Sequence, residues 1–321
     1  MPSTMDAIRV LWAKLAGKQT CLSHSSDADG VVCAALFLRA LRGRGVVVLA
    51  EPYDIQGGGW LNLFKWDYVM DLPCPSKALA FVDHHKTNRP SKAVERLYHD
   101  PSAPSAAALA IRALNLENDD VSLKLVELAN ECDMANIKSE DAWNLNDAVK
   151  GCPKDERLNL ARLLSTRGLE AFEVPEVKGW IARNRARRER TQELADKIPV
   201  EDNLFVILKD ENHISTRSLM ITLEKKGCKL TCVVTSKNGK YKVHLGSRED
   251  SGVDCSRLAS LLGGGGHERA AGATVNDLKR ALGVVAEAMM LKRVRVYVVD
   301  EMRLVEAKNF EVDGRVLREV E

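Results

Sequence analysis

The chain lacks the cysteine spacing that marks a structural zinc site or a disulfide framework. Its eight cysteines are scattered over 321 residues, and no two of them form a C-x-x-C pair. Scattered thiols of this kind are typical of proteins that stay reduced inside the cell. The sequence therefore predicts free cysteines and a cytoplasmic location.

Long apolar runs and a strong charge imbalance are also missing. No segment is apolar enough over sufficient length to span a membrane, and residues 1–18 resemble an amphipathic helix more than a signal peptide. The formal net charge of +2 argues against coating of a duplex, but it allows a local basic groove for a phosphorylated ligand. With 45% hydrophobic residues and no internal repeat, the chain is expected to form two compact domains.

Short apolar runs alternate with helical patterns in the first third of the chain. This alternation predicts an α/β domain with a doubly wound, mostly parallel sheet. We expect a helix at residues 30–43 and strands at residues 20–24, 46–51, 67–72 and 78–83. Ligands of such sheets bind outside the carboxyl ends of the strands. Polar residues that follow these strands should therefore meet at one edge.

The remainder of the chain divides into a helical part and a second lobe. Residues 104–166 have helical patterns, and a charged stretch after Pro175 is typical of a helical linker. The basic run "RNRARRER" in that stretch could follow a nucleic-acid backbone, but we interpret it as the solvated surface of the linker helix. Alternating strands and a helix then predict a smaller α/β lobe that ends in a hairpin at Asp313-Gly314. The predicted domains are residues 1–175, the linker 176–200 and residues 201–321.

Acidic residues and a histidine gather at the predicted sheet edge. Asp27 and Asp29 follow the first strand, Asp71 ends the third, His84 follows the fourth, and Asp133 lies in "NECDMAN". A single aspartate after a strand is most often a helix cap or a turn residue, but the joint occurrence favours a metal site. Carboxylate and imidazole suit manganese, magnesium or iron. Two ions about 3.5–4 Å apart can hold both oxygens of an in-line displacement at phosphate.

The second lobe carries "LLGGGGHERAAGATV" at residues 261–275. Its glycines permit close backbone approach, and successive N–H groups can form a nest for an anion. A flexible linker is the alternative, but linkers are rarely followed by His267, Arg269 and an Ala-Ala-Gly run. Arg248 in "HLGSRED" and Arg269 can each grip a phosphate with two parallel hydrogen bonds.

These motifs together resemble the DHH phosphoesterase superfamily, which is named for the signature found here at Asp83-His84-His85. The GGGGH segment resembles the DHHA1 domain of the first subfamily. The motifs occur in the family's order, and the resemblance covers nearly the whole chain. It implies a DHH domain followed by a DHHA1 domain, and a phosphodiesterase that uses two divalent ions, manganese or magnesium.

The resemblance also implies roles for individual residues. His85 would face the scissile phosphate, and Asp83 would orient a histidine. The implied metal ligands are His24, Asp27, Asp29, Asp71, His84 and Asp133, with Asp27 and Asp71 on one ion and Asp29, Asp71, His84 and Asp133 on the other. Relatives that use the first histidine place it four residues before the first aspartate, whereas His24 precedes Asp27 by three. Direct ligation by His24 therefore stays open. The implied substrate-binding residues are Arg248, Gly264, Gly265, Gly266, His267 and Arg269.

Several substrates are consistent with this family. The chain has no obvious room for the extra oligonucleotide-binding domain of bacterial RecJ, which favours short single-stranded oligonucleotides or small nucleotide phosphoesters, as for an oligoribonuclease of the nanoRNase type. The alternatives are a RecJ-like exonuclease on longer strands, a cyclic-dinucleotide hydrolase, and a non-catalytic DHH protein that binds nucleic acid or replication partners. The complete set of implied ligands argues against the last. We expect no membrane partner, and the sequence identifies no protein partner.

Overall fold

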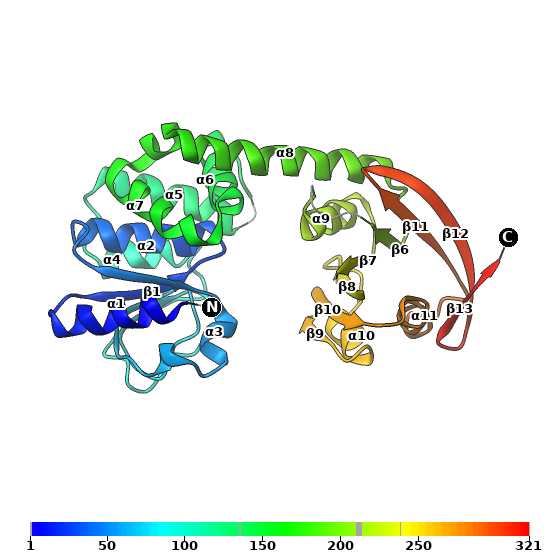
Figure 1. Cartoon of the computed structure of the whole chain (residues 1–321), viewed down its shortest axis with the longest axis horizontal. Helices are drawn as coiled ribbons and strands as arrows, with labels where there is room; N and C mark the ends of the chain where they lie inside the picture. The colour runs from blue at the N-terminus through cyan, green and yellow to red at the C-terminus, as the bar shows by residue number, and fades with distance from the viewer. Residues whose placement is uncertain (1, 135, 210–213, 238, 321) are drawn as a thin grey trace. The chain divides into compact units, whose positions relative to one another are not determined.

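The computed structural model describes residues 2–134, 136–209, 214–237 and 239–320, which form two compact units. The boundary between the units falls between Arg185 and Ala186, inside the long helix α8 (Pro175–Lys197; Figure 1). Among the described residues, no helix has the length and apolar character needed to cross a membrane.

The first unit contains a five-stranded sheet in which all neighbouring strands are parallel, in the order β2-β1-β3-β4-β5. The strands are β1 (Thr20–His24), β2 (Val46–Ala50), β3 (Trp66–Met70), β4 (Ala78–Asp83) and β5 (Arg96–His99). The first four match the predicted strands. The fifth was not predicted because "RLYH" is a partly exposed edge strand without an apolar run.

Helices cover both faces of this sheet, as predicted for a doubly wound fold. They are α1 (Thr4–Leu15), α2 (Ala28–Ala40), α3 (Pro52–Gln56), α4 (Ala107–Ala113), α5 (Asp120–Asp133), α6 (Glu140–Gly151) and α7 (Arg157–Arg167), with 3₁₀ turns at Trp60–Asn62, Lys154–Glu156 and Gly168–Glu173. Alternate strand residues enter two different cores. Leu22 packs in the core with α1 and α3, whereas its neighbour Cys21 packs in the core with α2, α4 and α5.

The second unit contains an eight-stranded mixed sheet in the order β13-β12-β11-β6-β7-β8-β10-β9. Its strands are β6 (Asn203–Leu208), β7 (Leu230–Lys237), β8 (Lys240–Ser247), β9 (Gly265–His267), β10 (Ala270–Val275), β11 (Arg293–Asp300), β12 (Arg303–Asp313) and β13 (Val316–Val320). Its helices are α9 (Thr216–Lys226), α10 (Cys255–Leu261) and α11 (Leu278–Ala288). The predicted Asp313-Gly314 hairpin joins β12 to β13, and Gly314 adopts a φ of 57° that favours glycine.

The glycine-rich segment forms the outer hairpin of this sheet, because β9 pairs with β10 in antiparallel register. A Cβ at Gly264 would lie 2.2 Å from the carbonyl oxygen of Gly272, and one at Gly266 would lie 2.5 Å from the Cα of Ala271. The glycines therefore serve close backbone approach, which is one of the two roles expected of them. The segment contributes strand β9, so it is not a flexible linker.

Candidate metal centre

The turn from β1 into α2 places two aspartates at the end of the sheet. Asp27 caps α2, and its Oδ1 accepts a hydrogen bond of 3.0 Å from the N–H of Gly30. A Cβ at Gly30 would lie 2.4 Å from the carbonyl oxygen of His24, so only glycine lets the helix begin this close to the strand. Asp27 is thus a helix cap, as is usual for an aspartate that follows a strand. Its carboxylate also faces the other acidic residues of the candidate metal site.

Asp29 is buried in the first turn of α2 and rigidly held. Its two carboxylate oxygens accept hydrogen bonds of 2.7 and 2.8 Å from the N–H groups of Ala106 and Ala107 at the start of α4. Burial raises the pKa of Asp29 to about 8, and the charges of Asp27 and Asp133 contribute to this rise. An ionised Asp29 therefore needs positive charge nearby.

Asp71 follows β3 and adopts a φ of 55°, in the left-handed region that Asp and Asn enter more readily than most residues. Burial, followed by repulsion from Asp29 and Asp27, raises the pKa of Asp71 well above its ordinary value. Its Oδ1 is buried and has no hydrogen-bond partner among the described residues. Because an unpaired buried oxygen is costly, a ligand at this position would stabilise it.

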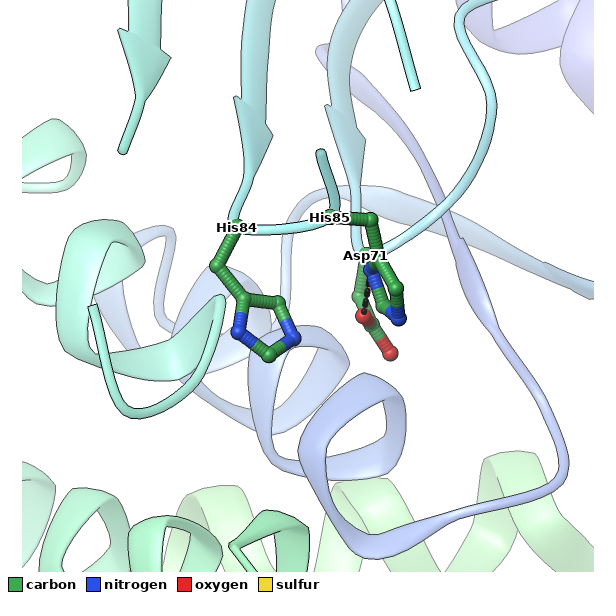
Figure 2. A group of neighbouring side chains, drawn as sticks. All are labelled: Asp71, His84 and His85. Carbon is green, nitrogen blue, oxygen red and sulfur yellow. Dashed lines mark ion pairs between the residues drawn. The ribbon is translucent and has the colours of Figure 1, made fainter. Parts of the chain in front are cut away.

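His84 directly follows β4, next to His85 (Figure 2), and its two ring nitrogens have different surroundings. Nδ1 lies 3.2 Å from the carbonyl oxygen of Ala103, to which it can donate. Nε2 is buried without a hydrogen-bond partner among the described residues, 3.4 Å from Oδ2 of Asp133 and 3.8 Å from Oδ2 of Asp29. One nitrogen bound to a carbonyl and the other facing carboxylates is the arrangement of a metal-binding imidazole.

His85 is held by the buried Asp83. Oδ1 of Asp83 accepts the backbone N–H of His85 and lies 2.9 Å from its Nδ1, while Asn88 donates to Oδ2 at 2.6 Å. The contact with Asp83 raises the pKa of His85. The His85 side chain is 47% exposed, and Nδ1 lies 3.6 Å from Oδ1 of Asp71, as the dashed line in Figure 2 marks. The imidazole is thus oriented and open to solvent.

His24 lies between carboxylates on both sides of its ring. Nδ1 is 2.7 Å from Oδ2 of Asp27 and 3.3 Å from Oδ2 of Asp71, and Nε2 is 3.3 Å from Oε2 of Glu51. Burial lowers the pKa of His24, but the contacts with Asp27 and Asp71 outweigh it and raise the pKa to about 11. Burial alone would raise the pKa of Asp27, yet His24 lowers it to about 2.

Glu51 was not predicted as a site residue. It directly follows β2, at the same edge of the sheet as the other strand-end residues. The predicted strand included Glu51 as its last residue, so its position at the carboxyl end of that strand is the signal that could have found it.

The ligand atoms of the predicted metal-binding residues converge in the first unit. Three groups have such atoms within 4.8 Å of one another: Asp71, His84 and His85; His24, Asp27 and Asp71; and Asp29, His84 and Asp133. Shared members join the three groups into one cluster.

This cluster fits divalent cations. Four carboxylates supply hard oxygen ligands and repel one another in a buried setting, and two buried acceptor atoms lack partners among the described residues. The Cys33 thiol lies 3.8 Å from Oδ1 of Asp29, but burial and the neighbouring carboxylates raise its pKa, so it stays protonated. The donors are therefore oxygen and imidazole nitrogen.

The predicted substrate-binding residues all lie in the second unit. Arg248 follows β8 and donates to Asp250 at 2.5 Å and to the carbonyl of Gly227 at 3.2 Å. Arg269 lies between β9 and β10 and donates to Glu249 at 2.6 Å. His267 ends β9 and is exposed, as are Gly265 and Gly266, while Gly264 precedes that strand.

A pocket of about 290 Å³ lies against the glycine hairpin. Gly265 and Gly266 line it together with three basic residues that were not predicted, Arg217, Lys242 and His244. Lys242 and His244 are two residues apart in β8, so they lie on one face of that strand. The alternation in "KYKVHLGS" is the signal that could have found them.

Comparison with known proteins finds a domain match in the second unit and a similar fold over most of the chain. Residues 204–290 match the DHHA1 domain family. The structure is similar to the pGpG-specific phosphodiesterase PggH from Vibrio cholerae, with a TM-score of 0.66 and 19% identity over 85% of this chain and 98% of PggH. It is also similar to a manganese-bound exonuclease RecJ (TM-score 0.57, 16% identity, 90% of this chain and 94% of that RecJ) and to magnesium-bound RecJ from Thermus thermophilus (TM-score 0.52, 18% identity, 92% of this chain and 53% of that RecJ). No curated protein sequence matches the chain.

Three observations agree with the resemblance seen in the sequence. The Asp83-His84-His85 motif ends a strand of a doubly wound sheet, and its histidines reach a cluster of carboxylates. The fold is similar to that of the solved structures above. The second unit carries a DHHA1 domain over residues 204–290, and the chain shares the fold of PggH and RecJ.

Proposed function

We propose that this protein is a metal-dependent phosphodiesterase that hydrolyses short single-stranded oligonucleotides or small nucleotide phosphoesters. One observation carries the proposal: Oδ1 of Asp71 and Nε2 of His84 are buried acceptors without hydrogen-bond partners among the described residues, within a cluster of carboxylates. Such a cluster is costly to bury unless cations complete it.

The cluster divides naturally into two cation positions. Asp27 and Asp71, with His24 beside them, would hold one ion. Asp29, His84 and Asp133 would hold the other, with Asp71 between the two groups. Ions bound there would neutralise the carboxylates and the substrate phosphate and lower the pKa of an attacking water.

His85 would bind the scissile phosphate directly. Its raised pKa favours the protonated imidazole, and Asp83 fixes the ring through Nδ1. The half-exposed side chain can therefore present Nε2–H to a phosphoryl oxygen. Asp83 acts through His85, because it is fully buried and its oxygens are occupied by His85 and Asn88.

The second unit would bind the terminal nucleotide. Its pocket of about 290 Å³ is just below the usual range for small-molecule sites, roughly 300–1,000 Å³, which suits part of one nucleotide. Arg217 and Lys242 would attract its phosphate, and the glycine hairpin gives the backbone close access. We also propose that Arg248, His267 and Arg269 bind the substrate. Each arginine would then leave its exposed carboxylate partner and bind a phosphate group instead.

The solved structures support a short substrate and also suggest an alternative. PggH is named for pGpG, which has two nucleotides, whereas RecJ is named as an exonuclease. A RecJ-like activity on longer strands is the second candidate.

The deciding experiment uses metal-stripped protein, restored with Mn²⁺ or Mg²⁺, and end-labelled RNA and DNA from dimers to long strands. We expect dimers to pentamers to be cut faster than a long strand at equal concentration. Processive degradation of a long strand while dinucleotides persist, with a steeper salt dependence, would establish the RecJ-like alternative. No hydrolysis of any substrate with either metal would contradict the proposal and favour a non-catalytic binding protein.

A further inference from the structure

His24 has a carboxylate partner on the side of its ring that faces away from the cation cluster. Nδ1 faces Asp27 and Asp71, while Nε2 lies 3.3 Å from Oε2 of Glu51. The side chains of His24 and Glu51 are 15% and 14% exposed, so water competes little for either nitrogen. Nδ1 therefore faces the cluster, and Nε2 faces a carboxylate outside it.

Glu51 is itself fixed by neighbours that leave its carboxylate little freedom. The hydroxyls of Ser25 and Ser26 donate to its Oε1, and Nη1 of Arg157 lies 3.9 Å away. Arg157 also donates to the carbonyl oxygen of Ser25 at 3.0 Å and to Oγ of Ser26 at 3.2 Å. This network ties the end of β2 to the loop that carries the first aspartates.

At the other end of the residue, the backbone N–H of Glu51 donates to Asp54 at 2.9 Å. Both the backbone and the side chain of Glu51 are therefore held in place, which a purely solvent-facing carboxylate would not require.

A metal-binding imidazole is neutral, with its lone pair on the ligating nitrogen and its proton on the other. A carboxylate that accepts that proton fixes the tautomer and the ring orientation and makes the ligating nitrogen more basic. Glu51 is placed to accept from Nε2–H. Without an ion, Nδ1–H can donate to Asp27 and Asp71; an ion bound beside them would replace that proton, and the lone pair of Nδ1 would face it.

We propose that Glu51 is a positioning residue that holds His24 with Nδ1 toward the cluster, so that His24 is a direct ligand of the ion beside Asp27 and Asp71. The inference rests on the metal site of the proposed function. It decides the question left open by the three-residue spacing between His24 and Asp27. The spacing from His24 to Asp27 is one residue shorter than in those relatives, but it is compatible with ligation because the contact between Nε2 and Glu51 orients the ring.

The test is a Mn²⁺ titration of the metal-stripped full-length protein, in which free Mn²⁺ is measured by electron paramagnetic resonance. We expect wild type to bind two ions. Glu51→Ala should bind one of them about 10- to 100-fold more weakly and leave the affinity of the other unchanged. His24→Ala should weaken the same ion. Glu51→Gln should retain more affinity than Glu51→Ala, because its amide oxygen can still accept from Nε2–H.

A double-mutant cycle separates positioning from general support of the fold. If Glu51 acts through His24, the double variant His24→Ala/Glu51→Ala should lose no more affinity than His24→Ala alone. Glu95→Ala is the matched control, since Glu95 is 58% exposed and forms its ion pair with Lys65, which does not belong to the cluster. It should bind both ions as wild type does.

Three outcomes would contradict the inference, and the third would also contradict the proposed function. Wild-type affinity for both ions in Glu51→Ala would overturn it, and so would additive losses in the double variant. If wild type binds no Mn²⁺ at all, the proposed function fails together with it, whereas the first two outcomes leave the proposed function intact.

Discussion

The polar residues of the first unit and those of the second are set into their sheets differently. In the first unit, carboxylates and imidazoles lie beneath the carboxyl ends of parallel strands, and Asp29, Asp71 and Asp83 are almost completely buried. In the second unit, Arg248 and Arg269 are partly or largely exposed and paired with exposed acids. Buried ligands are rigid and strongly coupled, which suits cations, whereas exposed cationic groups can exchange partners, which suits an incoming phosphate.

The largest expected effect is loss of the metal site on Asp71→Asn. Asparagine tolerates the φ of 55° at this position, so the fold should be retained. Because Asp71 belongs to two of the three ligand groups, both ions should bind more weakly. Hydrolysis should fall by more than the roughly 100-fold that loss of a supporting residue costs. Kinetics and elemental analysis of the same preparation would measure this.

Wild-type turnover by an Asp71→Asn protein that retains both ions would show that the cluster is not the site of chemistry. The comparison between a buried catalytic unit and an exposed binding unit would then fail.

The second effect is a loss of stability of the metal-free protein as pH rises. The pKa of Asp29 is about 8 in the folded protein against an ordinary value of 3.8. Its stabilising contribution is therefore complete below pH 3.8 and is lost as pH rises toward 8. Asp71 acts in the same direction. His24, with a pKa of about 11 against 6.5, adds to the loss above pH 6.5.

Tryptophan fluorescence measures this effect in the first unit alone, since all five tryptophans lie there: Trp12, Trp60, Trp66, Trp143 and Trp180. In chelator, the melting temperature should fall by several degrees between about pH 5 and 8, and saturating Mn²⁺ should reverse the trend because the ligands must be deprotonated. Asp133→Asn should give a shallower slope, since Asp133 raises the pKa of Asp29. A melting temperature that rises with pH in chelator would contradict the repulsion among the carboxylates.

A smaller effect is expected at the pocket of the second unit. Arg217→Ala or Lys242→Ala should raise KM for a short oligonucleotide about tenfold or more, as for loss of a hydrogen bond to a charged group. Hydrolysis of bis(p-nitrophenyl) phosphate should change little, because an activated ester needs less positioning. Equal losses on both substrates would show that the pocket supports the fold instead of binding a nucleotide.

The smallest effect is expected for Arg248→Ala and Arg269→Ala. Each guanidinium pairs with an exposed carboxylate at 2.5–2.6 Å, closer than the 3.6 Å between Arg217 and Glu224, and neither lines the pocket, so we expect KM to rise only about two- to fivefold. The salt dependence of oligonucleotide binding should lose about one unit of slope for each phosphate contact removed. A larger increase in KM for Arg248→Ala than for Arg217→Ala would reverse the order of importance within the second unit.

Much of the first unit could be predicted because local pattern and sheet geometry agree. Apolar runs identified β1, β2, β3 and β4, and parallel strands bring their carboxyl ends to one edge. That geometry was sufficient to expect Asp27, Asp29 and Asp71 near His84. The partly exposed edge strand β5 carries no such pattern and was missed for that reason.

Other parts of the site depend on contacts between distant segments. The N–H groups of Ala106 and Ala107 that hold Asp29 are 77 and 78 residues away in the chain. Arg157 reaches Ser25 over 132 residues. Periodicity describes only which face of an element is buried, so it does not indicate which partner that face meets.

The sequence by itself determined the order of the motifs, the doubly wound sheet and the kinds of ligand, since strand composition and strand-end residues are local properties of the chain. Only the tertiary structure decided how the charges are balanced: that Glu51 lies behind His24, that Nε2 of His84 lacks a hydrogen-bond partner among the described residues, and that Arg217 joins Lys242 beside the glycine hairpin. The physical reason is that burial and charge repulsion arise from groups brought together by packing, and their energies depend on distances that no local pattern encodes.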